Sequence, residues 1–151
     1  MTDRGNKMQL DEGEILLREG LIKFPSTPGE KPHIIARKCK KCSDIAFPGK
    51  ERCGKCDSTE MEEVLLSNKG KIYSYTIVMQ TIPGYEVPNI VAVVKMPEDD
   101  TLMIMTQIKD CSIQEVRCGM EVETIIADLF TKTNGQRVVG YAFRPSRGSD
   151  K

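Results

Sequence analysis

Four cysteines in two Cys-x-x-Cys pairs constrain this chain more than any other feature. Cys39 and Cys42 form the first pair, and after ten residues Cys53 and Cys56 form the second. Each pair is expected to form a tight turn whose two sulfurs point at one spot, and the intervening segment is long enough to fold back as a small hairpin. Four thiolates then surround one metal ion in a tetrahedron, at about 2.3 Å. The spacing therefore predicts a structural zinc ribbon.

The spacing alone leaves the metal open. A single iron, as in a rubredoxin, takes the same four thiolates as zinc, and two disulfides or four free thiols are the alternatives without a metal. A site closed by four protein sulfurs has no position left for water or substrate, so catalysis at the metal is not expected. Gly54 is expected to give the second turn a positive φ. His33, the only histidine, lies outside the paired turns and is interpreted as an exposed or cap-forming loop residue.

The composition bounds the class of protein. A chain of 151 residues suits one domain of ordinary size, or a small module beside a modest one. The 22 Lys and Arg balance the 22 Asp and Glu, so the overall charge indicates no polyanionic partner. No apolar run approaches the roughly 18 residues of a transmembrane helix, and the first residues lack the pattern of a signal peptide. A cytoplasmic, reducing compartment is therefore expected, and it favours a metal over disulfides.

Charge is unevenly distributed around the cysteines. Eight basic residues and only two acidic ones lie between Lys31 and Lys55, and four acidic residues follow between Asp57 and Glu63. A basic surface on the ribbon is therefore expected. Three interpretations are open: a solvated surface that balances the negative metal–thiolate centre, a docking site for phosphates, or a contact with an acidic protein face.

The first 32 residues are expected to form a helix and a linker. Asp11 is a candidate helix cap, with Glu14 three residues later as in a capping box, and Gly20 is a candidate stop. The apolar residues that begin at Ile15 need a surface to bury against, either the rest of this chain or a partner subunit. Residues 25–32 contain three prolines and one glycine, a composition that excludes helix and central strand.

After residue 63 the sequence has the pattern of strands. Runs rich in β-branched and aromatic residues, separated by turn signals, predict five strands, at 71–79, 90–96, 101–108, 122–130 and 137–143. The second and third are apolar nearly throughout, as expected when both faces are covered or when a barrel closes. Residues 112–115 are expected to form one helical turn. Five strands with this interruption predict a barrel of the OB type.

The predicted fold is therefore mainly β, with an N-terminal helix, a rubredoxin-like zinc ribbon and a five-stranded OB-type barrel. The predicted boundaries are 1–32 for the helix and linker, 33–63 for the ribbon, 64–145 for the barrel and 146–151 for a tail. The predicted metal ligands are the four paired cysteines. Cys111 and Cys118 stand outside the pairs and are interpreted as buried small apolar residues.

This order of parts resembles one family. A leading helix, a cysteine ribbon with Phe47 and Pro48 inside it and an OB-type barrel are together similar to the rubredoxin-like zinc-ribbon and acyl-CoA-associated OB-fold family. Further similar segments are 70–78, 91–94, 118–122 and 141–145, so the resemblance covers about residues 10–145. The chain departs from the family at Gly54, where proline is frequent, and at 97–100, where a glycine-containing turn is usual. Neither departure touches the predicted ligands.

The resemblance implies a non-catalytic role. Members of the family look like accessory subunits beside thiolase-superfamily enzymes, or are paired with hydratases and aldolases acting on CoA thioesters, and the partner carries the catalytic residues. A hetero-oligomer with a thiolase-superfamily subunit is therefore expected, with a CoA thioester bound through the complex. The basic ribbon is a candidate to face the CoA phosphates, and Tyr85 is a candidate to pack on the ligand or partner.

The residues themselves indicate no active site. One histidine, no Gly-x-Ser-x-Gly and no carboxylate–histidine cluster leave no nucleophile with an adjacent base. Two other functions fit parts of the sequence. A nucleic-acid-binding module fits the ribbon, the barrel and the basic segment, although the few aromatic residues argue against stacking on single strands. A rubredoxin-like electron carrier fits the four thiolates.

Overall fold

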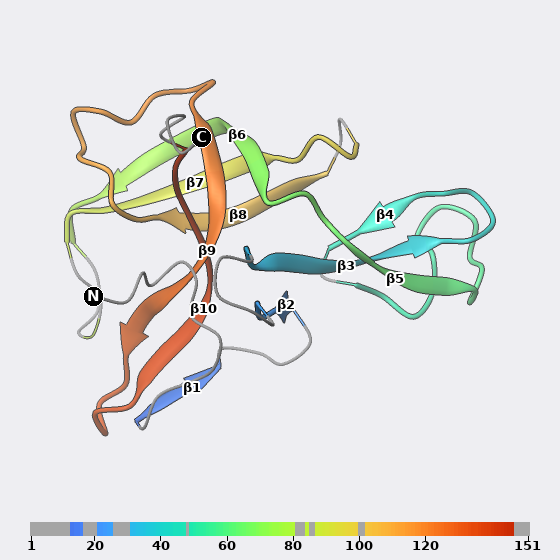
Figure 1. Ribbon diagram of the computed structural model, residues 1–151, viewed down its shortest axis with the longest axis horizontal. Coiled ribbons are helices and arrows are strands. Elements are labelled where there is room, and N and C mark those ends of the chain that lie inside the picture. Colours follow the sequence, from blue (N-terminus) through green and yellow to red (C-terminus); the bar gives the residue numbers. More distant parts are fainter. Residues whose placement is uncertain are drawn as a thin grey trace.

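The computed structural model describes residues 13–16, 21–25, 31–47, 49–80, 84, 87–99 and 102–146. All regular structure in these ranges is strand, and no helix occurs in them. Accordingly, none of the described segments is a helix with the length and apolar character needed to cross a membrane. The strands (Figure 1) are β1 (Glu14–Leu16), β2 (Ile22–Lys23), β3 (His33–Cys39), β4 (Ile45–Ala46), β5 (Met61–Leu65), β6 (Lys69–Val78), β7 (Asn89–Lys95), β8 (Met103–Ile108), β9 (Glu121–Thr131) and β10 (Arg137–Pro145).

Strands β6 to β10 close into a barrel. Antiparallel pairs join β6 to β7, β7 to β8, β6 to β9 and β9 to β10. A parallel contact between Phe143 of β10 and Ile108 of β8 closes the ring. The five predicted barrel strands are confirmed, and their closed order is that of a five-stranded barrel of the OB type.

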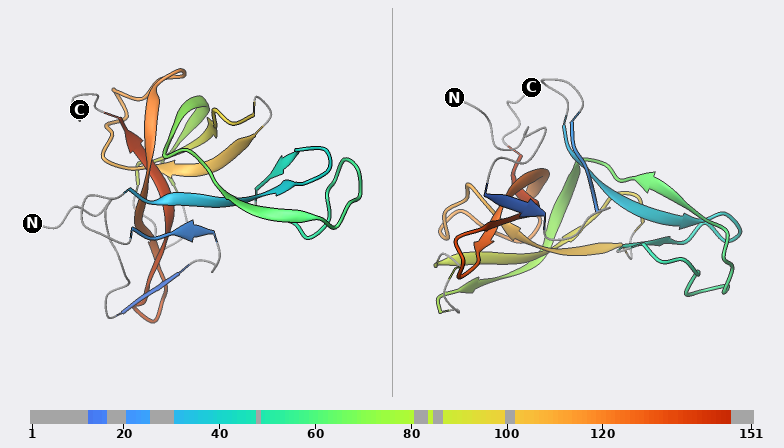
Figure 2. Two further views of the ribbon diagram at one scale, coloured as in Figure 1. Left: turned by 45° about the vertical axis from the view of Figure 1, so that its right-hand side comes forward. Right: turned by 90° about the horizontal axis from the view of Figure 1, so that it is seen from below.

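The smaller sheet is built around β3. This strand pairs antiparallel with β2, β4 and β5. Figure 1 shows β3, β4 and β5 projecting from one side of the barrel, and both views in Figure 2 show the same projection. The ribbon formed by β3, β4 and β5 therefore presents its far end away from the barrel.

One apolar core joins the ribbon to the barrel. Ile34 and Ala36 of β3 and Leu66 after β5 are at most 1% exposed and belong to the same cluster as the barrel residues. Phe47, after β4, packs edge-on against Tyr141 of β10, with ring centroids 5.4 Å apart. An edge-to-face pair of this kind adds about 0.5–1.5 kcal/mol to the effect of area burial. The base of the ribbon is thus part of the barrel's interior.

Strands β7 and β8 of the barrel bury one face only. On β7, Ile90, Ala92 and Val94 are at most 3% exposed, and the residues between them are half-buried. Strand β8 alternates in the same way, because successive side chains of a strand point to opposite faces. Of the two explanations for these apolar strands, the structure supports barrel closure. Met103 and Met105 of β8 stay exposed on the outside.

The prediction of an N-terminal helix is wrong for the part of that segment that the structure describes. Glu14–Leu16 and Ile22–Lys23 are strands, and residues 11, 12 and 17–20 lie outside the described ranges. Gly13 has a φ of 83°, which a right-handed helix does not accept. Strand β1 pairs in parallel with residues 137–139 of β10, and this tertiary pairing overrides the local helical pattern.

Two loops before and after β9 can be compared with their predictions. The segment predicted as one helical turn forms such a turn, in which the amides of Glu115 and Val116 donate to the Ser112 carbonyl at 3.0 and 3.3 Å. In the β9–β10 hairpin, Gly135 has a φ of 91°, as predicted for that turn. Both turns therefore lie where the sequence predicts them, and the turn after Ser112 does not continue into a helix.

Asn68 ties the linker to the barrel. Its side-chain amide donates to the carbonyls of Pro32, at 2.8 Å, and Thr124, at 3.1 Å. The backbone carbonyl of Asn68 accepts a hydrogen bond from the backbone amide of Thr124 at 2.6 Å. Asn68 is 8% exposed, so water does not easily replace these bonds. Three hydrogen bonds thus hold the segment before β3, the start of β6 and β9 together.

Replacing Asn68 with alanine is expected to lower the free energy of unfolding by about 2–3 kcal/mol, because two buried carbonyls lose their donor. Equilibrium unfolding in urea measures this difference. Gln114→Ala removes an amide from an exposed position and is the matched control, expected within about 0.5 kcal/mol of the wild type. Equal stability of the two variants would show that Asn68 does not hold this junction.

Candidate metal centre

The first cysteine turn begins where β3 ends. The Cys39 carbonyl accepts a hydrogen bond from the Ser43 amide at 2.9 Å, and the Cys39 amide donates to the Asp44 carbonyl at 2.8 Å. Strand β4 follows directly and pairs back with β3. The backbone of the turn is therefore fixed on both sides of the Cys39 and Cys42 pair.

The second turn repeats this pattern. The Asp57 amide donates to the Cys53 carbonyl at 3.0 Å, and the Cys53 amide donates to the Ser58 carbonyl at 2.8 Å. The left-handed residue is Asp57, with a φ of 63°, as Ser43 is in the first turn, with a φ of 67°. The prediction that Gly54 supplies the positive φ is therefore wrong. Each turn closes one residue after its second cysteine, so the left-handed position falls there.

The two turns bring the four predicted ligands together. The sulfurs of Cys39, Cys42, Cys53 and Cys56 all lie within 4.8 Å of one another. Two sulfur–sulfur distances across the turns, from Cys39 to Cys56 and from Cys42 to Cys53, are 3.5 Å. A zinc–sulfur bond of about 2.3 Å gives a tetrahedron with edges of about 3.8 Å. The spacing of the sulfurs thus fits a tetrahedral thiolate site.

Backbone amides stabilise negative charge on the first cysteine of each pair. The Lys41 and Cys42 amides point at the Cys39 sulfur, at 3.4 and 3.5 Å. The second turn repeats this arrangement, with the amides of residues 55 and 56 at 3.3 and 3.5 Å from the Cys53 sulfur. Cys39 and Cys53 are buried, whereas Cys42 and Cys56 are exposed. One side of the centre faces the ribbon and the other faces solvent.

The same contacts set the pKa values of the thiols. The Cys42 amide is the main cause that lowers the pKa of Cys39 to about 6, and the Cys56 amide lowers the pKa of Cys53. The Asp44 amide lowers the pKa of Cys42, but the Cys53 sulfur and burial outweigh it and raise that pKa to about 12. Like charges at 3.5 Å repel, so the four sulfurs ionise together only around a cation. The donor set fits a thiolate-binding metal.

The cysteines form no disulfide. None of the six is paired in a disulfide, so of the non-metal alternatives the structure does not support the two disulfides. Cys111 is half-buried and packs at the edge of the barrel core. Cys118 is exposed, in the turn in which Gly119 has a φ of 87°. The interpretation of Cys118 as a buried apolar residue is therefore wrong, because that turn faces solvent.

His33 is not part of the cluster. It is the first residue of β3 and half-buried, and its Nδ1 lies 2.8 Å from the Leu66 carbonyl. The interpretation as a loop residue is wrong, because His33 is already part of β3 and pairs with Lys23 of β2. This hydrogen bond fastens β3 to the segment between β5 and β6.

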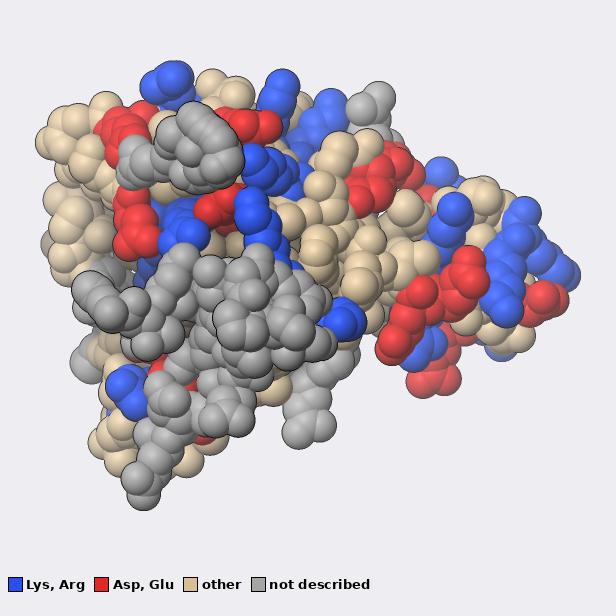
Figure 3. All heavy atoms as spheres, in the orientation of Figure 1, with Lys and Arg blue, Asp and Glu red and all other residues tan. Residues whose placement is uncertain are grey.

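Acidic residues balance much of the basic segment on the ribbon. Figure 3 shows Asp and Glu beside Lys and Arg over the projecting end, so this face is not uniformly basic. Exposed pairs of this kind contribute about 0–1 kcal/mol each, but they offset most of the expected excess of positive charge. The cross-strand neighbours are Arg37 with Glu63 and Lys38 with Glu62, and the ion pairs are Lys55–Asp44 at 3.4 Å and Arg52–Asp57 at 3.3 Å.

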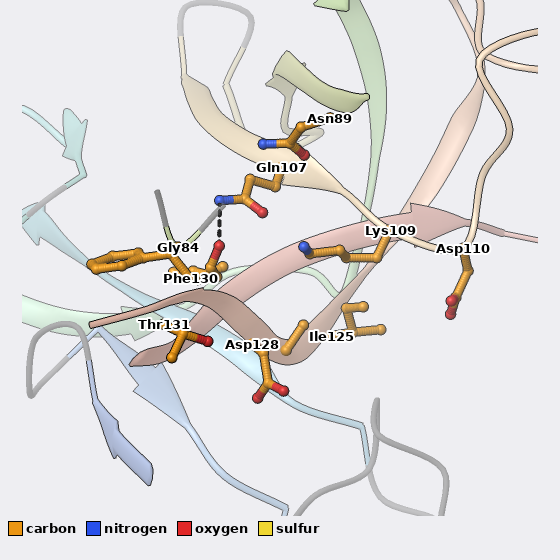
Figure 4. Close-up of a pocket in the computed structure, with 11 residues that line it drawn as sticks. Gly84, Asn89, Gln107, Lys109, Asp110, Ile125, Asp128, Phe130 and Thr131 are labelled. Carbon is orange, nitrogen blue, oxygen red and sulfur yellow. Dashed lines mark hydrogen bonds between the residues drawn. The ribbon is translucent and has the colours of Figure 1, made fainter. Parts of the chain in front are cut away.

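A pocket that no sequence motif indicated lies between β8 and β9. It has a volume of about 230 Å³, and Figure 4 shows Gln107 and Lys109 on one side of it and Ile125 and Asp128 on the other. The Gln107 amide donates to the Leu129 carbonyl at 3.2 Å. Among the described residues, the lining contains no serine, cysteine or histidine. Its residues come from distant segments, which explains why the sequence gave no signal. Tyr85, the candidate to pack on the ligand or the partner, lies outside the described residues.

The comparisons with known proteins agree with this architecture. Residues 63–125 match the family described as ChsH2, C-terminal OB-fold domain. A solved structure described as the Ltp2-ChsH2(DUF35) aldolase has the same fold, with a TM-score of 0.63 and 22% identity over 75% of this chain and 84% of that chain.

Two relatives cover the ribbon as well as the barrel. A DUF35 domain-containing scaffold protein of Methanocaldococcus jannaschii is 36% identical over 122 residues, which is 77% of this chain and 84% of the relative. The benzoylsuccinyl-CoA thiolase subunit BbsA of Geobacter metallireducens is 31% identical over 116 residues, which is 77% of each chain. At this identity and coverage, the chain belongs to the DUF35 family, with a C-terminal OB-fold domain of the ChsH2 type.

Proposed function

We propose that this chain is a non-catalytic, zinc-binding scaffold subunit of a thiolase-type complex that makes or breaks carbon–carbon bonds in CoA thioesters. The observation that carries the proposal is the similarity, over most of both chains, to a DUF35 scaffold protein and to a subunit of benzoylsuccinyl-CoA thiolase. Benzoylsuccinyl-CoA is accordingly the first substrate to test. The chain would support the folding and docking of its partner and the binding of the CoA substrate.

The cysteine cluster supports a structural role for the metal. Cys39, Cys42, Cys53 and Cys56 would hold one zinc ion, and the zinc would supply a cross-link between the two turns. Four sulfurs fill a tetrahedral site and leave no position for a substrate. Such thiols stay available to a metal in a reducing compartment, so we place the complex in the cytoplasm. A division into a ribbon at 33–63 and a barrel at 64–145 is part of the same proposal.

The remaining chemistry of the chain supports placing catalysis on the partner. His33, the only histidine in the sequence, lies at hydrogen-bond distance from a backbone carbonyl. A thiolase-type reaction needs an activated nucleophile with an adjacent base, and the two remaining cysteines, Cys111 and Cys118, lie outside the metal-binding cluster. The catalytic residues would therefore belong to the larger subunit, and this chain would position that subunit or its CoA substrate.

Elemental analysis of the purified chain is expected to give about one zinc ion per chain, because four thiolates complete one site. Cys56→Ser removes one of the four sulfurs and is expected to lose most of the zinc and to lower the melting temperature. Cys118→Ser also removes an exposed thiol but is expected to keep both. A red, iron-loaded protein would favour the electron carrier, and a metal-free, fully folded protein would contradict the proposal.

The purified chain alone is expected to show no CoA-dependent cleavage of benzoylsuccinyl-CoA or of a short 3-oxoacyl-CoA. A thiolase-type subunit from the same organism is expected to co-purify with it and to reach full activity only in its presence. The rate of CoA-dependent cleavage, measured for each protein alone and for the mixture, tests this. A thiolase-type subunit that is equally active and stable without this chain would overturn the proposal.

A further inference from the structure

Large exposed apolar side chains concentrate on one part of the barrel. Of the seven that the described residues contain, four lie on β6 or β8 and two in the connection between β6 and β7. The seventh, Leu65, lies on β5 of the ribbon. The right-hand view of Figure 2 shows β6, β7 and β8 along one margin of the molecule, with β9 and β10 on their other side. These three strands form an antiparallel meander.

The registers of the meander place a set of these residues together on its outer side. Val93 of β7 lies opposite Met105 of β8 and, across the other edge, opposite Ser74 of β6. Tyr73 is the extra residue where the β6 register shifts, and it is 58% exposed. Met105 is 68% exposed. We name Tyr73, Val91, Val93, Met103 and Met105 the meander face.

Scattered apolar residues on a surface are ordinary, but a contiguous set is not. Large contiguous apolar patches on soluble proteins mark interaction sites. Tyr and Met are among the residues enriched where two proteins meet, and buried tyrosines often contribute most of the binding energy. The opposite sides of β7 and β8 already fill the barrel core, so barrel packing does not explain the apolar character of the meander face.

The charges of the three strands restrict what can cover this face. Strands β6, β7 and β8 contain Lys69, Lys71 and Lys95 and no Asp or Glu. Lys71 lies directly opposite Lys95, and like charges in this position repel. On β9, Glu121 lies opposite Lys71 and Glu123 lies opposite Lys69, so two carboxylates border this end of the face. The face is therefore apolar in the middle, basic at the Lys71 and Lys95 end, and polar at the other end, where Thr76 and Gln107 flank Val91.

This charge distribution disfavours a second copy of the chain as the cover. In a symmetric dimer the same patch meets itself, so β6, β7 and β8 of the second copy would bring further lysines, and its carboxylates would lie only at the β9 edge. A different protein with an apolar surface and an acidic rim would satisfy both features. Electrostatic complementarity of this kind sets the orientation and rate of association.

We infer that the meander face is the surface on which the thiolase-type partner subunit docks, with acidic residues of the partner against the Lys71 and Lys95 end. The inference rests on the proposed function for the existence of that partner, and adds which face of the barrel it contacts. Tyr73 and Met105 would be the central contacts, since they expose the most side chain on the face.

The test compares binding of full-length variants to the thiolase-type subunit by isothermal titration calorimetry. Met105→Glu places a charge in the centre of the face and is expected to raise the Kd by about tenfold or more, in the range of a hot-spot residue. Met105→Leu keeps an apolar side chain and is expected to bind as the wild type does. Leu65→Glu makes the same chemical change at an exposed apolar residue of the ribbon, 48% exposed, and is the matched control.

A second measurement addresses the basic end. The double variant Lys71→Glu and Lys95→Glu is expected to weaken binding, and the remaining affinity should depend less on salt than that of the wild type, because attraction to the acidic rim is lost. Unchanged zinc content and melting temperature of every variant show that the fold is intact. If the double variant binds the partner as the wild type does but has a raised KM for the CoA thioester, the lysines contact the ligand. That result would overturn the inference that acidic residues of the partner face them.

The outcomes separate this inference from the proposed function. If the wild-type chain does not bind a thiolase-type subunit at all, the proposed function fails. If it binds and Met105→Glu binds equally well, the docking face lies elsewhere and only this inference fails. If the chain alone is a dimer that Met105→Glu dissociates while partner binding is unchanged, the face joins two copies and the inference is overturned.

Discussion

Strand β3 belongs to the ribbon and to the barrel core at once. Its alternation turns Ile34 and Ala36, both 0% exposed, into the shared core, and its last residue, Cys39, carries the first sulfur of the cluster. A shift of one residue would turn the core side chains to solvent, so the register of β3 is strongly specified. The packing that seats the ribbon on the barrel therefore also fixes where the first sulfur is presented.

The two ends of the ribbon depend on different stabilising interactions. Near the barrel, apolar burial and the Phe47–Tyr141 contact hold it. At the far end the residues around the cysteines are mostly exposed, and a segment with so little apolar surface has little hydrophobic stabilisation of its own. A metal cross-link supplies folding free energy at such a site. With a metal bound, the two together would make the projection rigid along its length, as the proposed scaffold role requires.

The sequence predicts those features whose cause is local. The Cys-x-x-Cys spacing predicts the cluster, and the strand pattern predicts the five barrel strands, because both depend on residues close in the chain. The N-terminal helix was wrong because β1 depends on its pairing with β10, more than 120 residues later. The basic ribbon was overestimated for the same reason, since Glu62 and Glu63 return beside Lys38 and Arg37 only through the β3–β5 register. The pocket at Gln107 joins four segments and had no local signal.

The fold of this chain alone does not fully explain the apolar sequence of strand β7. An antiparallel strand with one face in the core and one in water normally alternates apolar and polar residues. Between Ile90 and Val94 of β7, however, every residue is apolar, and barrel closure accounts only for the side that contains Ile90, Ala92 and Val94. An apolar outer side reduces solubility unless another surface covers it. A scaffold subunit whose partner covers this side needs no further explanation for the pattern, whereas a barrel that acts alone does.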